Sequence, residues 1–220
     1  MKICVAIDGP AGAGKSTIAK LVAKEFNLMY INTGAMYRAV ALKAAENNLN
    51  PENVEEICRL IKDMKMKFEN DDLILDGVNV QDKITMPEIS SMVSAYASIP
   101  EVRKILVTLQ RDMSEEYDVI MDGRDIGTVV LKDSPFKFFL TATPEERAER
   151  RFKELQNRNI IDCNYEKILK DIIERDYKDS HRATDPLKKA EDAVEVDTTG
   201  LNIQEVTDFI TKNIAERLNK

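Results

Sequence analysis

The sequence predicts an α/β fold of three layers, in which a parallel sheet carries helices on both faces. Short apolar runs recur along the chain, and each leads through a polar turn into a helical pattern. Strands that alternate with helices in this way are typical of parallel sheets. The chain has 220 residues, of which 43% are hydrophobic, so a single domain over residues 1–220 can bury a sizeable core.

The first strand is predicted at residues 3–7, an apolar run that a glycine-rich turn connects to an amphipathic helix over residues 16–26. Later apolar runs predict strands at residues 117–121, 136–140 and 193–196. Three further helices are predicted from start signals, either an N-cap residue before proline or the spacing of a capping box. These signals lie at Asn50-Pro51, Thr143-Pro144 and Asn202-Ile203.

Residues 64–81 follow a different pattern, with a period of two. Met64, Met66 and Phe68 alternate with lysines, a polar turn follows, and Asp76-Gly77 is a typical hairpin turn. We expect a small antiparallel sheet here, inserted outside the main sheet.

Charge and cysteine content exclude several classes of protein. Lys and Arg number 32 against 39 Asp and Glu, and the net charge of −7 opposes non-specific binding to nucleic acid. No run of the sequence approaches the ~20 apolar residues that span a bilayer. Cys4, Cys58 and Cys163 lie far apart without CxxC spacing, which argues against a disulfide framework and a zinc site. We expect a cytoplasmic monomer without nucleic-acid or membrane partners.

Residues 9–16 match the phosphate-binding pattern GxxxxGK[ST], directly after the first strand and at the start of a helix. Glycines allow the backbone N–H groups to turn inward, where they and the helix N-terminus hold phosphate oxygens. Lys15 can reach the β and γ phosphates, and the Ser16 hydroxyl can bind Mg²⁺. An ordinary glycine-rich turn is the alternative, but the flanking strand and helix favour a nucleoside triphosphate.

Two further segments suggest a second binding site. Thr33 offers a hydroxyl near a helix start, and Arg38 offers a planar guanidinium suited to a phosphate monoester. Asp122 and Asp125 follow an apolar strand, at the edge where open α/β sheets bind ligands. We expect Asp122 to face Mg²⁺ through water, and Asp125 to face an acceptor. The alternatives are a capped helix with a solvated arginine and a structural Asp-Gly turn.

The phosphate loop predicts the ligand and not the reaction, because kinases, GTPases and motor ATPases share it. The guanine-reading sequence Asn-Lys-x-Asp is absent, and 220 residues leave little room for a remodelling ATPase. Phosphoryl transfer to a small acceptor is therefore favoured. The alternatives left open are a kinase acting on UMP, AMP or shikimate, and a nucleotide-dependent switch without turnover of a small acceptor.

Five motifs, in this order and spacing, make the chain resemble bacterial cytidylate kinases, which are P-loop nucleoside monophosphate kinases. They are the phosphate loop, residues 32–38 (NTGAMYR), the three-stranded insertion, residues 122–128 (DGRDIGT) and residues 174–187 (ERDYKDSHRATDPL). The resemblance implies a P-loop kinase core at approximately 1–32, 100–150 and 180–220. It also implies a region that binds the nucleoside monophosphate (NMP) at 33–99, with the β insertion at 64–81, and a short helical lid at 151–179.

The resemblance further implies the reaction and the residues that serve it. The γ-phosphoryl group of ATP, bound with Mg²⁺, is transferred to CMP and dCMP, giving CDP and dCDP for pyrimidine nucleotide metabolism. ATP is held by Gly9, Pro10, Ala11, Gly12, Ala13, Gly14, Lys15, Ser16 and Thr17, and Mg²⁺ by Ser16 and Asp122. CMP is held by Thr33, Arg38, Ser94, Arg103, Asp125, Asp179 and Arg182. Transfer is assisted by Lys15, Arg124, Arg175 and Arg182, and the lid carries Arg151 and Arg158.

Chemistry makes these roles plausible, because cytosine presents an amino donor that a carboxylate such as Asp125 can accept, whereas uracil presents an acceptor there. Asn32-Thr33-Gly34 departs from the Asp-Ser-Gly more common in the family, although Thr33 keeps the hydroxyl. Arg147 and Arg150 are interleaved with glutamates along a helix, which predicts surface salt bridges.

Overall fold

A computed structural model of the chain describes residues 2–157 and 164–218, and its main sheet is parallel throughout. The strand order is β2-β6-β1-β7-β8. The strands span β1 (Cys4–Asp8), β2 (Met29–Asn32), β6 (Val119–Gly123), β7 (Phe136–Thr141) and β8 (Val194–Asp197). The predicted parallel sheet is therefore confirmed. The sequence pattern does not predict β2, because this strand has only four residues and ends in a polar one.

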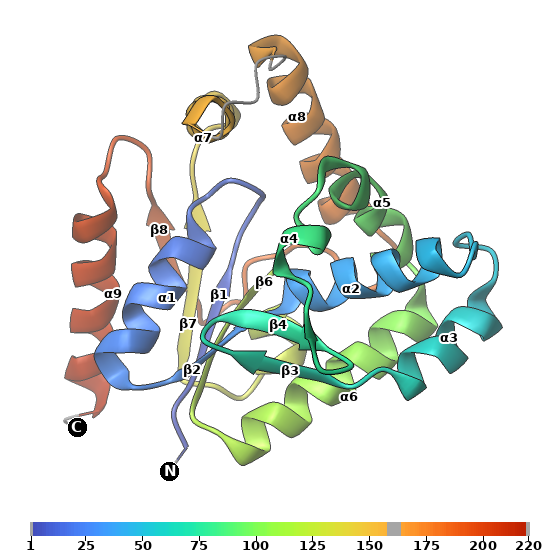
Figure 1. Cartoon of the computed structure of the whole chain (residues 1–220). Coiled ribbons are helices and arrows are strands. Elements are labelled where there is room, and N and C mark those ends of the chain that lie inside the picture. The colour runs from blue at the N-terminus through green and yellow to red at the C-terminus, as the bar shows by residue number, and fades with distance from the viewer. Residues whose placement is uncertain (1, 158–163, 219–220) are drawn as a thin grey trace.

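Helices cover both faces of this sheet (Figure 1). On one face lie α1 (Lys15–Phe26) and α9 (Ile203–Leu218). On the other lie α2 (Thr33–Glu46), α3 (Val54–Asp63), α5 (Pro87–Ala97) and α6 (Pro100–Glu116). Strand β1 is buried on both faces, because Val5 and Ile7 enter one core and Ala6 enters the other. Apolar residues in succession are what a central parallel strand requires.

The predicted antiparallel insertion is confirmed as a separate sheet of β3 (Met66–Glu69), β4 (Asp72–Leu75) and β5 (Val78–Asn79). Asp76 and Gly77 both have positive φ, at 52° and 82°, as a tight hairpin turn of this kind requires. A short helix, α4 (Gln81–Ile84), follows and packs against α2. The insertion therefore lies beside α2, the helix that begins at Thr33.

Helices α7 (Pro144–Asn157) and α8 (Tyr165–His181) pack against each other beyond the sheet edge where the strands end (Figure 1). The start signals at Thr143 and Asn202 are confirmed, since each side chain accepts a backbone N–H from three residues on. The expected helix start at Asn50 is wrong. Asn50 and Asn53 form a turn, with Asn50 N donating to Asn53 Oδ1 at 2.9 Å, and this turn delays the helix to Val54.

A π-helical turn, η1 (Ile126–Val130), follows β6 and returns the chain towards β7. Cys4 and Cys58 are free thiols, and Cys163 lies outside the described residues. Among the helices of residues 2–157 and 164–218, none is both long and apolar enough to cross a lipid bilayer.

Candidate active site

The phosphate loop, residues 9–16, connects the end of β1 to the first turn of α1. Gly9 has a φ of 145°, and a Cβ atom there would lie 2.0 Å from the carbonyl oxygen of Leu140, so only glycine fits. Gly14 has a φ of 85° and immediately precedes α1. Because the first N–H groups of a helix have no partner within that helix, this arrangement can hold an anion.

Lys15 lies at the base of the loop and is 6% exposed, with its Nζ donating to the carbonyl oxygen of Pro10 at 2.7 Å. Burial lowers the pKa of Lys15 well below the ordinary lysine value, and the nearby charges of Arg124 and Arg175 lower it further. A phosphate bound here would offset this repulsion.

Three arginines, Arg38, Arg124 and Arg175, form what we call the arginine cluster. Burial lowers the pKa of Arg175 to about 10, with repulsion from Arg124 as the next cause. Burial likewise lowers the pKa of Arg38, and Arg124 also disfavours its charge. The buried Nε atoms of Arg38 and Arg175 find no hydrogen-bond partner among the described residues. Buried cations with unsatisfied donors are the arrangement expected of an anion site.

Asp122 joins the phosphate loop to the strands beside it. Its Oδ2 accepts from the Ser16 hydroxyl at 2.8 Å, and its Oδ1 accepts from the Tyr30 hydroxyl at 2.9 Å. The Thr33 hydroxyl donates to the backbone carbonyl of Asp122 at 2.8 Å, so Thr33 is placed at the site, although its proton is already engaged. A buried carboxylate and a hydroxyl thus meet beside the loop that can hold phosphates.

Asn32 caps α2 and extends this network. Its Oδ1 accepts from Ala35 N at 2.8 Å, and its Nδ2 donates to the Tyr30 hydroxyl at 3.1 Å. The Tyr30 proton is thereby left to bond Asp122. An amide at position 32 can cap the helix and donate to Tyr30 at the same time, which a carboxylate cannot do.

Asp125, Arg103 and Arg182 form a second buried group, which we call the Asp125 pocket. Arg103 NH2 donates to Oδ2 of Asp125, and Arg182 NH2 donates to Oδ1 at 3.3 Å. Asp125 is 5% exposed and Arg103 is 1% exposed, so these charges are nearly withdrawn from solvent. The structure therefore brings together three residues that lie far apart in the sequence, as the resemblance implies.

Asp179 connects the Asp125 pocket to the arginine cluster. It accepts from Arg124 Nε at 2.8 Å, and Arg175 Nε lies 4.0 Å from the same oxygen. Although burial opposes ionisation, the charges of Arg124 and Arg175 hold the pKa of Asp179 below its ordinary value. Arg182, just after the end of α8, is also near enough to favour the ionised carboxyl.

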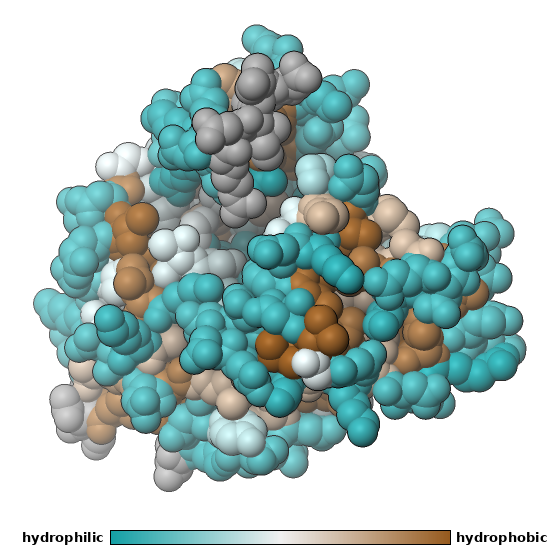
Figure 2. All heavy atoms as spheres, viewed as in Figure 1, coloured by the Kyte–Doolittle hydropathy of each residue, from teal (hydrophilic) through white to brown (hydrophobic). Residues whose placement is uncertain are grey.

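The remaining predicted residues are less closely tied to this centre. Ser94 is half-buried on α5, which packs against α2 and α8. Arg151 pairs with Glu154 at 2.7 Å on an exposed part of α7. Arg158 lies outside the described residues. Figure 2 shows a hollow between the phosphate loop and helices α4 and α5, with hydrophilic residues above it on α7 and α8.

Arg147 corrects the expectation of a surface salt bridge. It is 3% exposed, donates to Ala11 O at 2.9 Å in the phosphate loop, and donates to Asp176 Oδ2 at 2.6 Å on α8. Only Arg150 behaves as expected, pairing with Glu146 at 3.1 Å. Arg147 is buried because its side of α7 faces the phosphate loop. In the sequence, the neighbouring apolar residue Ala148 is the signal that this side of α7 is buried.

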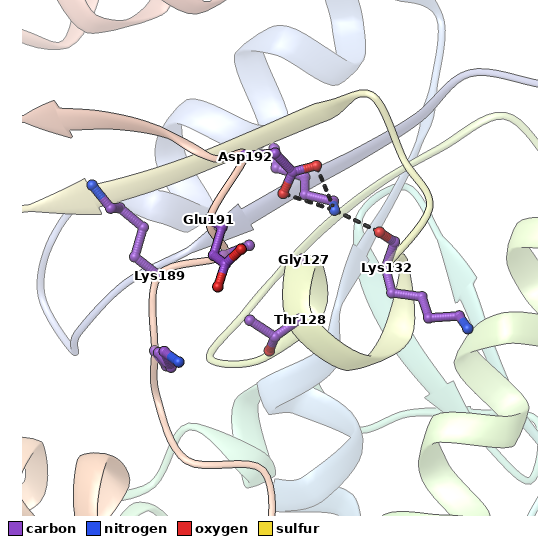
Figure 3. A pocket seen from close by; sticks show the side chains of 9 residues that line it. Gly127, Thr128, Lys132, Lys189, Glu191 and Asp192 are labelled. Atoms are coloured by element: carbon purple, nitrogen blue, oxygen red, sulfur yellow. Dashed lines mark hydrogen bonds and ion pairs between the residues drawn. The ribbon is translucent and has the colours of Figure 1, made fainter.

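A cavity of about 380 Å³ lies elsewhere, between η1, β7 and residues 188–192. Four lysines line it, but Lys137 is already bonded to Asp192 at 2.8 Å and to the carbonyl oxygen of Lys132. In Figure 3 the side chains of Lys132 and Lys189 point in different directions. These ammonium groups do not converge on one ligand. The cavity is separate from the phosphate site, because no residue of the phosphate loop lines it.

A glycine-rich loop that joins the first strand to the first helix of a parallel sheet, with buried basic groups facing it, defines a P-loop protein of the kinase type. Comparison with known proteins refines this class. The family model described as cytidylate kinase matches residues 5–216, so the chain belongs to the cytidylate kinase family.

Relatives agree with the family model over nearly the whole chain. A protein of Clostridium perfringens named cytidylate kinase is 64% identical over 209 residues, which cover 95% of this chain and 96% of the relative. A protein of Clostridium acetobutylicum with the same name is 59% identical over 218 residues, which cover 99% of this chain and 100% of the relative. A solved structure of an uncharacterized protein from Eubacterium ventriosum has a TM-score of 0.56 at 14% identity. The match covers 98% of this chain and 99% of that protein. This last similarity concerns the fold alone.

Proposed function

We propose that the protein transfers the γ-phosphoryl group of ATP to CMP, forming ADP and CDP. The observation that carries the proposal is the arginine cluster, in which the buried Nε atoms of Arg38 and Arg175 have no hydrogen-bond partner among the described residues. The charges of Arg124 and Arg175 act on Lys15 in the phosphate loop, and Arg124 also donates to Asp179. The phosphate loop suits the phosphates of the donor nucleotide, and the Asp125 pocket suits a small polar base. Membership in the cytidylate kinase family supports the same donor and acceptor.

On the donor side, residues 9–17 hold the phosphates of ATP through their backbone N–H groups, which every residue except Pro10 supplies, and Lys15 neutralises the β and γ groups. Arg175 and Arg124 then stabilise the charge that spreads over the phosphoryl oxygens during transfer. The phosphate of CMP is anionic and attacks without losing a proton, so no general base is needed. His181 is accordingly left outside the mechanism, stacked on Tyr177 with ring centroids 4.1 Å apart.

On the acceptor side, Arg38 binds the phosphate of CMP, and Thr33 joins it by turning its hydroxyl from the Asp122 carbonyl to the phosphate. Asp125 accepts a hydrogen bond from the exocyclic amine of cytosine. Arg103 and Arg182 orient that carboxylate and donate to the ring acceptors. Uracil would place an acceptor oxygen against Asp125, and two acceptors without a proton between them repel. We assign Ser94 and Asp179 to the same substrate.

Mg²⁺ fits the residues beside the loop. It prefers oxygen ligands and commonly uses few protein groups together with phosphates and water. The Ser16 hydroxyl and Asp122 meet at 2.8 Å, whereas the described residues contain no group of three or more His, Cys, Asp or Glu able to form a metal cage. We propose that Ser16 binds the ion, with Asp122 acting through water. The ion would neutralise charge on the transferring phosphates.

The same proposal divides the chain by role. The core comprises approximately 1–32, 100–150 and 180–220, residues 33–99 bind the nucleoside monophosphate, and residues 151–179 form the lid, including Arg151 and Arg158. A lid over the transferring group limits attack by water, which would waste ATP. We further propose that dCMP is a substrate and that the protein is a cytoplasmic monomer.

A panel of acceptors tests the proposed function. ADP release would be measured with Mg·ATP and CMP, dCMP, UMP, AMP or shikimate, each at several concentrations. We expect the highest kcat/KM with CMP and substantial use of dCMP. Better use of UMP or AMP would contradict the substrate, and ATP hydrolysis that does not depend on any acceptor would favour a nucleotide-dependent switch.

A further inference from the structure

Asp185 has an unusual backbone conformation next to the Asp125 pocket. Its φ is 47°, in the left-handed region that residues with a Cβ atom seldom adopt, and Pro186 follows it directly. A residue before proline normally prefers extended backbone. Such a conformation persists when surrounding contacts hold it, and it is found most often at functional sites.

Two arginines, Arg103 and Arg182, donate the hydrogen bonds that hold Asp185. Its backbone carbonyl accepts from Arg182 Nε at 2.7 Å, and its Oδ2 accepts from Arg103 Nε at 2.9 Å. The Asp185 side chain is 28% exposed, whereas Arg103 is 1% exposed, so the interaction lies at the edge of a buried charge. The left-handed turn directs the carbonyl to one arginine and the carboxylate to the other.

These two arginines are the same two that hold Asp125. The four residues form a closed ring in which Arg103 and Arg182 each contact both aspartates. Their side chains carry two positive and two negative charges, which cancel. Arg103 is fixed further by the carbonyl oxygen of Ala97 at 3.1 Å. The orientation of Asp125 therefore depends on Asp185 through the arginines.

We propose that Asp185 is a positioning residue that determines base specificity in the Asp125 pocket. This proposal rests on the proposed function, because it concerns how CMP is distinguished from UMP. The Asp185 carboxylate fixes the plane of the Arg103 guanidinium and balances one of the two positive charges. Asp125 then keeps its free lone pairs directed towards the exocyclic amine of the base.

The charge of Asp185 matters because the pocket is nearly closed to water. Without it, Asp125 would be the one carboxylate left in the ring, and Arg103 and Arg182 would each attract it more strongly. The net charge of the ring would be positive, which favours a base edge that presents an acceptor oxygen, as uracil does. Loss of the charge should therefore weaken CMP binding and reduce discrimination against UMP.

Asp185→Asn is a sharp test, because asparagine tolerates left-handed backbone and leaves the carbonyl contact to Arg182 in place. Asp185→Gly removes the whole side chain, and glycine can still adopt the left-handed backbone conformation of residue 185. The matched control is Asp192→Asn. Asp192 follows in the same segment, lines the separate cavity of Figure 3, and pairs with the buried Lys137 at 2.8 Å.

The measurement is kcat and KM for CMP, UMP and ATP in the wild type and all three variants. For both Asp185 variants we expect KM for CMP to rise about tenfold and the CMP-to-UMP ratio of kcat/KM to fall about tenfold, as for one lost charged hydrogen bond. KM for ATP should stay within about twofold of the wild type, and Asp192→Asn should resemble the wild type.

Three results would overturn the proposal: unchanged KM for CMP and unchanged discrimination, an equal rise in KM for ATP, or the same effect in Asp192→Asn. If the Asn variant folds poorly, the Gly variant carries the same measurement. Failure of the proposed function is distinguishable, because it would already be visible in the wild type as a lack of preference for CMP over UMP.

Discussion

The Ser16 hydroxyl lies 2.8 Å from Oδ2 of Asp122, which joins the first turn of α1 to the carboxyl end of β6. The contact spans 106 positions of the sequence. It places a hydroxyl and a buried carboxylate beside the phosphate loop, at the sheet edge where ligands of α/β proteins bind. The same carboxylate is held from its other side by Tyr30.

Asp122→Asn should raise the Mg²⁺ concentration needed for half-maximal activity by about tenfold to a hundredfold, as is typical when a group that orients a metal site is lost. Activity at fixed ATP, measured against Mg²⁺ concentration, gives this value. Asp118→Asn is the control, because Asp118 accepts from Ile3 N at 2.7 Å near the opposite end of β6. An identical Mg²⁺ dependence in the Asp122 variant and the wild type would contradict the role of Asp122.

Asp125→Asn should reduce the preference for CMP over UMP by about tenfold to a hundredfold, since a hydrogen bond to a charged group is lost and the amide can donate to uracil. The ratio of kcat/KM for the two acceptors measures this change. KM for ATP should be unaffected, because among the described residues the Asp125 side chain bonds to Arg103 and Arg182 and not to the phosphate loop. A preference for CMP that survives the substitution would refute base recognition by Asp125.

Arg147→Ala should destabilise the fold by about 3–5 kcal/mol, because it removes a buried cation and leaves the Asp176 carboxylate unpaired. Arg147 contacts both the phosphate loop and α8, so the Kd for ATP should also rise. Urea unfolding and ATP binding provide the two measurements. Arg151→Ala, on an exposed part of the same helix, should change stability little. Equal changes in unfolding free energy for Arg147→Ala and Arg151→Ala would show that the buried contacts of Arg147 do not stabilise the fold.

Local patterns in the sequence predict the phosphate loop, the insertion and most strands, because each depends on residues close together along the chain. The roles of Arg147 and Asp185 could not be predicted in this way. Arg147 contacts Ala11 across 136 positions, and Asp185 contacts Arg103 across 82. Such contacts depend on how segments pack, which no spacing rule encodes. Strand β2 cannot be predicted locally for a related reason, since pairing with β6 stabilises so short a segment.

Asp8 should make stability depend on pH. Burial raises the pKa of Asp8 from 3.8 to about 6, although the backbone N–H groups of Ile126 and Gly127 donate to it and act in the opposite direction. Asp125 also raises this pKa, and Lys15 lowers it. The folded state therefore binds a proton that the unfolded state releases between pH 4 and 6. Stability from protonated Asp8 is fully present below about pH 4 and is lost as pH rises through about 6.

Asp8→Asn removes this contribution, so its stability relative to the wild type should improve by about 2 kcal/mol between pH 4 and pH 7. Urea unfolding of both proteins across this range measures the difference at each pH. A difference that stays constant with pH would show that Asp8 does not titrate in this interval.

Arg175→Ala should lower kcat by about a hundredfold to a thousandfold with little change in KM for ATP, because Arg175 is placed to stabilise charge that develops during transfer. Its buried Nε has no hydrogen-bond partner among the described residues, so a transferring phosphoryl group can occupy that donor. Arg175→Lys should recover only part of the rate, since an ammonium lacks the planar donors of a guanidinium. Steady-state kinetics would be compared with Lys178→Ala, which changes an exposed residue on the same helix and should leave kcat unchanged. If KM rose while kcat was preserved, Arg175 would bind substrate and transition state equally, and its assignment to the transfer step would be wrong.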